Sequence, residues 1–126
     1  MKSLTTSLLL LGLLMGCATI GSLGTAANQL DDESRRFYEQ LHAERGTANA
    51  DSEAAALADA ARDFSRAVND NMSRENLRQV FNRVSERYHR RRNRLDDSNY
   101  RDSYQRAGFD RVTQAYLDVD RALNHP

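Results

Sequence analysis

Apolar residues recur at spacings of three and four along most of the chain, which is the period of an α-helix with one buried face. The longest such run predicts a helix that begins after Ser73, a favourable N-cap residue, and extends to about Leu95. The positions that would face the core, with Val80 beside them, are Leu77, Phe81, Val84, Tyr88, Arg91 and Leu95. Apolar and polar residues alternate nowhere over the length of a strand, so we expect an all-α protein.

Two helices are predicted ahead of this one. The first covers residues 28–45 and ends at Gly46, because glycine is the usual residue just past a helix C-terminus. The second begins at a cap formed by Asp51 or Ser52 and continues to about Asn69. The buried face of the first would comprise Leu30, Ser34, Phe37, Tyr38 and Leu41, and that of the second Leu57, Ala61, Phe64 and Val68.

A fourth helix is predicted over residues 109–123. Its buried face would comprise Phe109, Val112, Tyr116, Val119 and Leu123. Two alternatives are open for its start. Asp102 and Gln105 have the spacing of a capping box, which would put Gly108 inside the helix at a cost of about 1 kcal/mol; otherwise residues 100–107 form a separate turn. The connections between the four helices are short, so we expect an up-down-up-down four-helix bundle.

The first residues of the chain have the features of an export signal. Lys2 supplies a positive charge, and residues 8–14 are apolar except for Gly12. This apolar run is far shorter than the roughly 20 residues that a membrane-spanning helix needs. A positive start followed by a short apolar run is typical of a secretory signal peptide.

The run ends in Leu14, Met15, Gly16 and Cys17. These four residues resemble the lipobox of bacterial lipoproteins. The resemblance implies that the Cys17 thiol receives a diacylglycerol, that a signal peptidase cuts before Cys17, and that the new amino terminus is acylated as well. Ala18, which is not aspartate, would by the same resemblance favour the outer membrane. The alternatives are an ordinary secretory signal with an accidental cysteine and an uncleaved membrane anchor.

These features divide the chain into three parts. Residues 1–16 would be a signal peptide, residues 17–28 a lipidated cysteine with a flexible tether, and residues 29–126 the helical bundle. The tether is predicted because its residues are mostly small, uncharged and include glycine. Leu, Ile, Val and Phe are scarce in the bundle, so we expect a thin core supplemented by alanine and tyrosine. A domain that stays disordered until it joins a larger envelope complex is an alternative.

One pattern raises the possibility of a metal site. Glu39 and His42, like Glu86 and His89, form a Glu-x-x-His motif on a predicted helix, as in the di-iron site of ferritin-like bundles. At about 100° per residue, Glu39 and Glu86 fall roughly 160° and 175° from the centres of the buried faces, which places both in solvent. We therefore expect no metal or cofactor site. The alternative is a bundle that binds metal or haem through histidine and carboxylate side chains; Met72, at a helix boundary, does not support it.

Charge is distributed unevenly along the mature chain. Residues 17–72 contain five arginines and ten acidic residues, residues 73–94 eight arginines and two glutamates, and residues 95–126 four arginines and six aspartates. One interpretation is internal pairing, in which the basic third helix packs beside acidic neighbours. The other is an anion-binding collar around the last two turns of that helix, formed by Arg87, Arg90, Arg91, Arg92 and Arg94. Arg91 lies in the core-facing seam, so its guanidinium would have to extend out to solvent at the bundle end.

The sequence contains no catalytic motif, so we expect a non-enzymatic protein. Its predicted role is that of an outer-membrane-anchored periplasmic lipoprotein, an interaction or structural module that contacts peptidoglycan or an acidic envelope protein. Nucleic acid is not expected as a partner, because the chain has an export signal and a net charge near zero. In an up-down-up-down bundle anchored at Cys17, the arginine collar would lie at the end farthest from the membrane.

Overall fold

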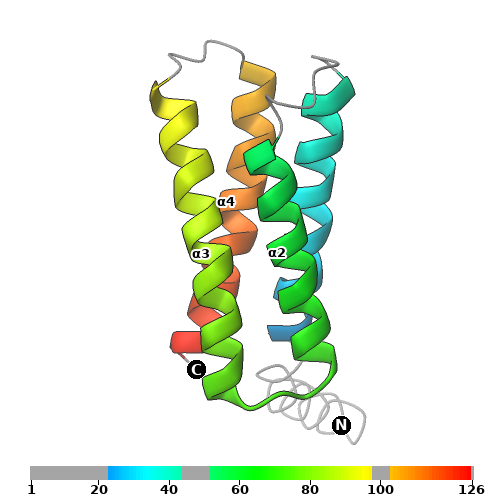
Figure 1. Ribbon diagram of the computed structural model, residues 1–126, viewed down its shortest axis with the longest axis vertical. Helices are drawn as coiled ribbons and strands as arrows, with labels where there is room; N and C mark the ends of the chain where they lie inside the picture. The colour runs from blue at the N-terminus through cyan, green and yellow to red at the C-terminus, as the bar shows by residue number, and fades with distance from the viewer. Residues whose placement is uncertain (1–22, 44–51, 98–102, 126) are drawn as a thin grey trace, which may run out of the picture.

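The computed structural model of the protein describes residues 23–43, 52–97 and 103–125 (Figure 1). Four helices account for nearly all of them: residues 23–43, here called helix 23–43, then α2 (Ser52–Asn69), α3 (Arg74–Asp97) and α4 (Ser103–Asn124). No strand occurs in these three ranges, so the prediction of an all-α protein is confirmed for the part that the structure describes. None of these helices is long and apolar enough to span a bilayer.

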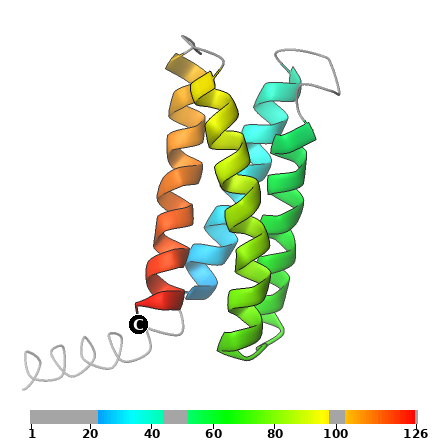
Figure 2. The same ribbon diagram turned by 60° about the vertical axis from the view of Figure 1, so that its left-hand side comes forward.

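The helices lie side by side, and each runs antiparallel to its neighbours (Figures 1 and 2). Four contacts join the start of one helix to the end of an adjacent one: Asn28 with Ser65, Glu53 with Arg94, Arg74 with Leu123, and Phe109 with Phe37. Each helix therefore has two antiparallel neighbours, the arrangement expected of an up-down-up-down bundle. The end of α3 lies beside the start of α2, at the opposite pole from the turn that joins these two helices.

The core consists of the residues that the helical period predicts. Nearly all of the predicted face residues that the structure describes are buried, including Phe81 and Phe109, each 4% exposed, whereas Tyr38, Val68 and Val80 are half-buried against the core. Larger apolar side chains form most of the core, and alanines complete it: Ala26, Ala27, Ala54, Ala60, Ala61, Ala67 and Ala115. With the buried rings of Tyr88 and Tyr116, these alanines supplement the core as expected.

The first helix includes residues that we expected in the tether. The structure is already helical at Leu23, whereas the sequence predicted a helix start near Asn28 and a bundle start at residue 29. Ala26 and Ala27 are buried, at the same helical spacing from Leu30 as the rest of the face. The prediction was wrong because these alanines were interpreted as linker composition rather than as core positions. Residues 1–22, with the predicted signal peptide, lie outside the described residues.

The structure decides between the two predicted starts of α4. Helical structure begins at Ser103, so a separate turn over residues 100–107 is wrong, and the capping-box residue Asp102 lies outside the described residues. Gly108 is inside the helix and buried. A Cβ atom there would lie 3.0 Å from the Oε1 atom of Gln40 and 3.3 Å from the Cδ1 atom of Phe37. Glycine therefore permits the close approach of α4 to helix 23–43.

The two ends of α3 follow the sequence to different degrees. The Oγ atom of Ser73 accepts a hydrogen bond from the backbone N–H of Asn76 at 3.2 Å, so the predicted N-cap is confirmed. At the other end the helix continues through Asp97, two residues beyond the predicted end near Leu95. In the turn between α2 and α3, Asn71 has a φ of 57°, a left-handed conformation that asparagine tolerates better than most residues.

Candidate functional site

The arginine-rich end of α3 is at the pole of the bundle where α2 begins. Arg90, Arg92 and Arg94 are exposed there, and Arg87 is half-exposed. The Nη1 atom of Arg94 lies 3.4 Å from the Oε1 atom of Glu53 in the first turn of α2. Four of the five predicted collar residues therefore present charge at or near the surface of one pole.

Arg91 differs from these four. Its side chain is 6% exposed, and its guanidinium carbon lies 5.3 Å from the centroid of the Phe37 ring. The predicted seam position is correct, but the prediction that the guanidinium reaches solvent is wrong. The face of an aromatic ring attracts a cation, so Phe37 offers an interaction inside the bundle that the sequence pattern could not reveal. Arg91 belongs to the core and not to an exposed collar.

Internal pairing accounts for only part of the basic charge on α3. Arg94 forms an ion pair with Glu53, which joins α3 to α2. Arg87, Arg90 and Arg92 form no ion pair within the same ranges. Three other acidic residues of helix 23–43 and α2, Asp32, Glu33 and Asp59, pair with an arginine of their own helix, and Glu33 also pairs with Arg111 of α4. The arginines that lack such partners remain available to an external anion.

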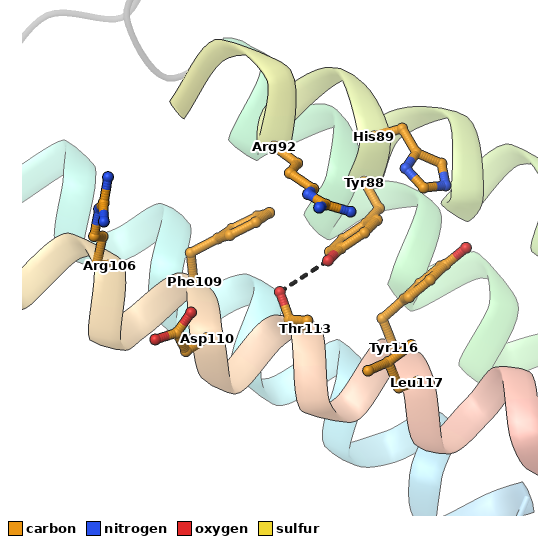
Figure 3. A pocket seen from close by; sticks show the side chains of 9 residues that line it. All are labelled: Tyr88, His89, Arg92, Arg106, Phe109, Asp110, Thr113, Tyr116 and Leu117. Atoms are coloured by element: carbon orange, nitrogen blue, oxygen red, sulfur yellow. Dashed lines mark hydrogen bonds between the residues drawn. The ribbon is translucent and has the colours of Figure 1, made fainter. Parts of the chain in front are cut away.

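A groove of about 420 Å³ lies between α3 and α4 next to this end (Figure 3). Its lining consists of Tyr88, His89, Arg92, Arg106, Phe109, Asp110, Thr113, Tyr116 and Leu117. The sequence pattern assigned Tyr88, Phe109 and Tyr116 to the core and predicted no groove. Leu117 was the available signal, because it is a large apolar residue on the otherwise polar face of α4 and is 42% exposed.

Aromatic rings form the floor of the groove. The ring of Tyr88 stacks on Phe109, with centroids 5.4 Å apart, and on Tyr116, with centroids 4.2 Å apart. The hydroxyl of Tyr88 shares a hydrogen bond of 2.9 Å with the Oγ1 atom of Thr113, and that of Tyr116 shares one with the Oγ atom of Ser85. Burial raises the pKa of Tyr116 above its ordinary value, an effect that the hydrogen bond with Ser85 opposes. Stacking and hydrogen bonds together hold the rings in place.

Charged side chains form the rim. Arg92 comes from α3, whereas Arg106 and Asp110 come from the first half of α4, and all three are exposed. Figure 3 shows Arg92 extending from α3 toward the rings and Arg106 at one end of the groove, beside Phe109. His89 packs edge-on against Tyr88, with ring centroids 5.3 Å apart. The groove thus combines an apolar floor with two guanidinium groups and one carboxylate.

The Glu-x-x-His residues do not come together. Glu39, His42, Glu86 and His89 are all exposed, and the position of both glutamates in solvent is confirmed. Within the described ranges no group of three or more His, Cys, Asp or Glu side chains could hold a metal ion. Met72 lies in the turn between α2 and α3 and is 39% exposed. The predicted lipidation site, Cys17, lies outside the described residues.

Comparison of the chain with protein-family models, with curated proteins and with solved structures finds no match.

Proposed function

We propose that this protein is a lipoprotein of the bacterial cell envelope that holds an anionic partner near the outer membrane. The sequence Leu14 to Cys17 supports the lipid anchor, because it resembles a lipobox at the end of a short apolar run. The observation that carries the binding role is the end of α3, where Arg87, Arg90 and Arg92 form no ion pair with any described residue. The protein would act by binding and not by catalysis.

The position of the anchor supports a defined orientation. Only residues 18–22 separate Cys17 from the helical residue Leu23, and five extended residues span at most about 18 Å. The start of helix 23–43 contacts the end of α2, since Asn28 is hydrogen-bonded to Ser65. A lipid on Cys17 would therefore keep this pole of the bundle close to the membrane surface, on its periplasmic side.

The arginine-rich end would then face away from the membrane. Helix α3 contains 24 residues and so spans about 36 Å between the two poles. Beyond that distance, the anions available in the periplasm are the carboxylates of peptidoglycan and those of acidic envelope proteins. Exposed arginine contacts are screened at physiological ionic strength, so we expect micromolar or weaker affinity.

Sedimentation with purified peptidoglycan tests the binding role. The full-length chain in nonionic detergent micelles should sediment with peptidoglycan at low salt and be released as salt is added. A variant with Arg87→Glu and Arg90→Glu should lose sedimentation while its helical circular dichroism is unchanged, because Arg90 is exposed and Arg87 is only partly buried.

The matched control reverses two charges at the other pole. Arg66 and Arg78 are exposed and form no ion pair with described residues, so Arg66→Glu with Arg78→Glu changes the net charge equally. This control should still sediment with peptidoglycan. Equal loss in both variants would mean that net charge, rather than the end of α3, determines binding. Failure of the unmodified chain to sediment at low salt would refute the cell-wall partner.

A further inference from the structure

We infer that the groove between α3 and α4 binds a short acidic peptide segment. Two carboxylates of the peptide are held, one by Arg92 and the other by Arg106, and a neighbouring apolar side chain packs on Tyr116 and Leu117. The inference rests on the proposed function for the class of ligand, an anionic envelope partner, and assigns that ligand a specific site.

The groove has the size and the rigidity of a ligand site. Its volume of about 420 Å³ lies within the range typical of small-ligand pockets, and its lining combines apolar rings with a few polar groups. The ring of Tyr88 is held between two other rings, and its hydroxyl is hydrogen-bonded to Thr113. Because the floor is ordered before binding, little conformational entropy remains to be lost when a ligand arrives.

Two guanidinium groups give the groove its preference for anions. Arg92 and Arg106 come from different helices and form no ion pair or hydrogen bond with a described residue. Guanidinium groups bind carboxylates through two parallel hydrogen bonds, which fixes the orientation of the bound group. Arg106 also lies in the first turns of α4, where the helix dipole favours negative charge.

Asp110 favours a peptide over other anions. Its carboxylate lines the same groove and would repel a densely charged anion, such as a phosphate group or a polyanion backbone. It can accept a hydrogen bond from a backbone N–H, and a peptide supplies such a donor close to its own carboxylate. A ligand with two singly charged carboxylates separated by amide N–H groups fits this set of charges.

The apolar part of the ligand is assigned from Leu117. Leu117 and Met72 are the two large hydrophobic side chains that are exposed in the described residues, and Leu117 lines the groove. It lies beside Tyr116, whose ring is part of the floor. An apolar side chain placed here would cover both residues and remove apolar surface from water.

The probe we choose is the peptide acetyl-Glu-Trp-Glu-amide. The chain contains no tryptophan, so selectively excited indole fluorescence reports on the peptide alone. With the full-length chain in nonionic detergent micelles, and with the signal of empty micelles subtracted, we expect saturable, salt-sensitive binding of one peptide per chain. Acetyl-Gln-Trp-Gln-amide should bind more weakly because it lacks the carboxylates, and acetyl-Glu-Ala-Glu-amide should compete poorly because it lacks the apolar ring.

Substitutions at the rim test the assigned contacts. Arg92→Gln and Arg106→Gln should each weaken binding about threefold, and the double variant about tenfold, since an exposed ion pair contributes at most about a factor of five. Leu117→Asn should also weaken it. The matched control is Arg83→Gln, which removes an exposed arginine of α3 that does not line the groove and should leave the affinity unchanged.

Several outcomes would overturn the inference. Unchanged affinity in the double arginine variant, or equal binding of the glutamine peptide, would exclude the carboxylate site. A dimer that dissociates with Leu117→Asn would show that a second copy of the chain occupies the groove. If the chain sediments with peptidoglycan through Arg87 and Arg90 but does not bind the peptide, the groove fails and the proposed function stands. If the chain binds the peptide but does not sediment with peptidoglycan, the groove stands and the cell-wall partner is wrong.

Discussion

The rings of Tyr88 and Tyr116 stack face to face across the α3–α4 interface, with centroids 4.2 Å apart and planes 7° apart. Phe109 continues this column on one side through Tyr88, and Phe81 continues it on the other side through Tyr116. The column extends from the groove floor into the core, so its rings contribute both to the groove and to the stability of the fold. Variants meant to test binding are therefore best made at the rim, and variants of the column report on stability.

Truncation of the column should be costly. Phe81 packs on Phe64 and on Tyr116, with centroids 5.4 Å and 5.3 Å away, and it is buried. We expect Phe81→Ala, and equally Phe109→Ala, to lower the free energy of unfolding by about 3–5 kcal/mol. Urea unfolding followed by circular dichroism measures the change. Val80→Ala, at a half-buried position one residue away, should cost much less; a similar cost would contradict the assigned core.

Two glycines should respond differently to alanine. A Cβ atom at Gly24 meets nothing within 4 Å. Gly24→Ala should therefore raise the free energy of unfolding by up to about 1 kcal/mol, because alanine has the higher helix propensity. At Gly108 the new methyl group would lie 3.3 Å from the ring of Phe37, which would have to move. We expect Gly108→Ala to raise the free energy of unfolding clearly less than Gly24→Ala does, or to lower it. Equal gains in urea unfolding would show that α4 and helix 23–43 are not as close as described.

The stability of the fold should fall at alkaline pH in a way that depends on Tyr116. Burial raises the pKa of Tyr116 above 10.0, and Asp120 and Tyr88 contribute in the same direction, whereas Ser85 opposes the shift. A group with a raised folded-state pKa stabilises the fold below its unfolded pKa, and this contribution is lost as the pH rises through the folded-state value. Urea unfolding at a series of alkaline pH values should show this loss.

The variant Tyr116→Phe isolates this effect. It removes the hydrogen bond with Ser85, which should cost about 1 kcal/mol at neutral pH. It also removes the ionisable hydroxyl, so its stability should fall less steeply than that of the parent as the pH is raised. An identical alkaline loss in both proteins would mean that other groups cause it.

The Glu-x-x-His residues offer a test of the metal or haem alternative. Glu39 and Glu86 are exposed and form no ion pair with described residues, so Glu39→Ala and Glu86→Ala should each change stability by less than about 0.5 kcal/mol. The purified chain should be colourless and hold no stoichiometric metal by elemental analysis. A bound metal that either substitution removes would favour the alternative over a pure binding protein.

The anchor can be tested through Cys17. Cys17→Ser removes the thiol that would accept the diacylglycerol, so we expect the chain to leave the detergent-soluble membrane fraction or to accumulate uncleaved. Fractionation and intact-mass measurement of the parent and the variant provide the readout. A mature parent chain that begins at Cys17 without added lipid would contradict the lipoprotein assignment.

The helical period predicted the helices correctly where large apolar residues recur at helical spacing. The face of α3 from Leu77 to Tyr88 and that of α4 from Phe109 to Leu123 are buried as predicted. The start of the first helix was missed because Ala26 and Ala27 carry the period with small side chains. Alanine is common both in linkers and in tightly packed helices, so composition alone could not distinguish them.

The groove could not be predicted, because it depends on how two helices are aligned. The stacking of Tyr88 on Tyr116 sets which rim residues face each other, and this alignment is a property of the packed bundle. The exposed arginines at the end of α3 could be predicted from sequence, since they cluster within two turns. The burial of Arg91 could not, because it requires the ring of Phe37 from a distant segment.

The position of Arg91 over Phe37 bears on which bundle the chain can form. A buried guanidinium is tolerated only where its surroundings compensate the loss of water, and a hydrophobic residue in its place is often neutral or stabilising. The alanines of the interior are interchangeable in size, so the contacts that they make do little to distinguish one helix pairing from another. A reversed or slipped pairing of α3 would separate Arg91 from the ring of Phe37 and lose this interaction. We therefore expect Arg91 to disfavour alternative topologies, which alanine packing alone would not exclude.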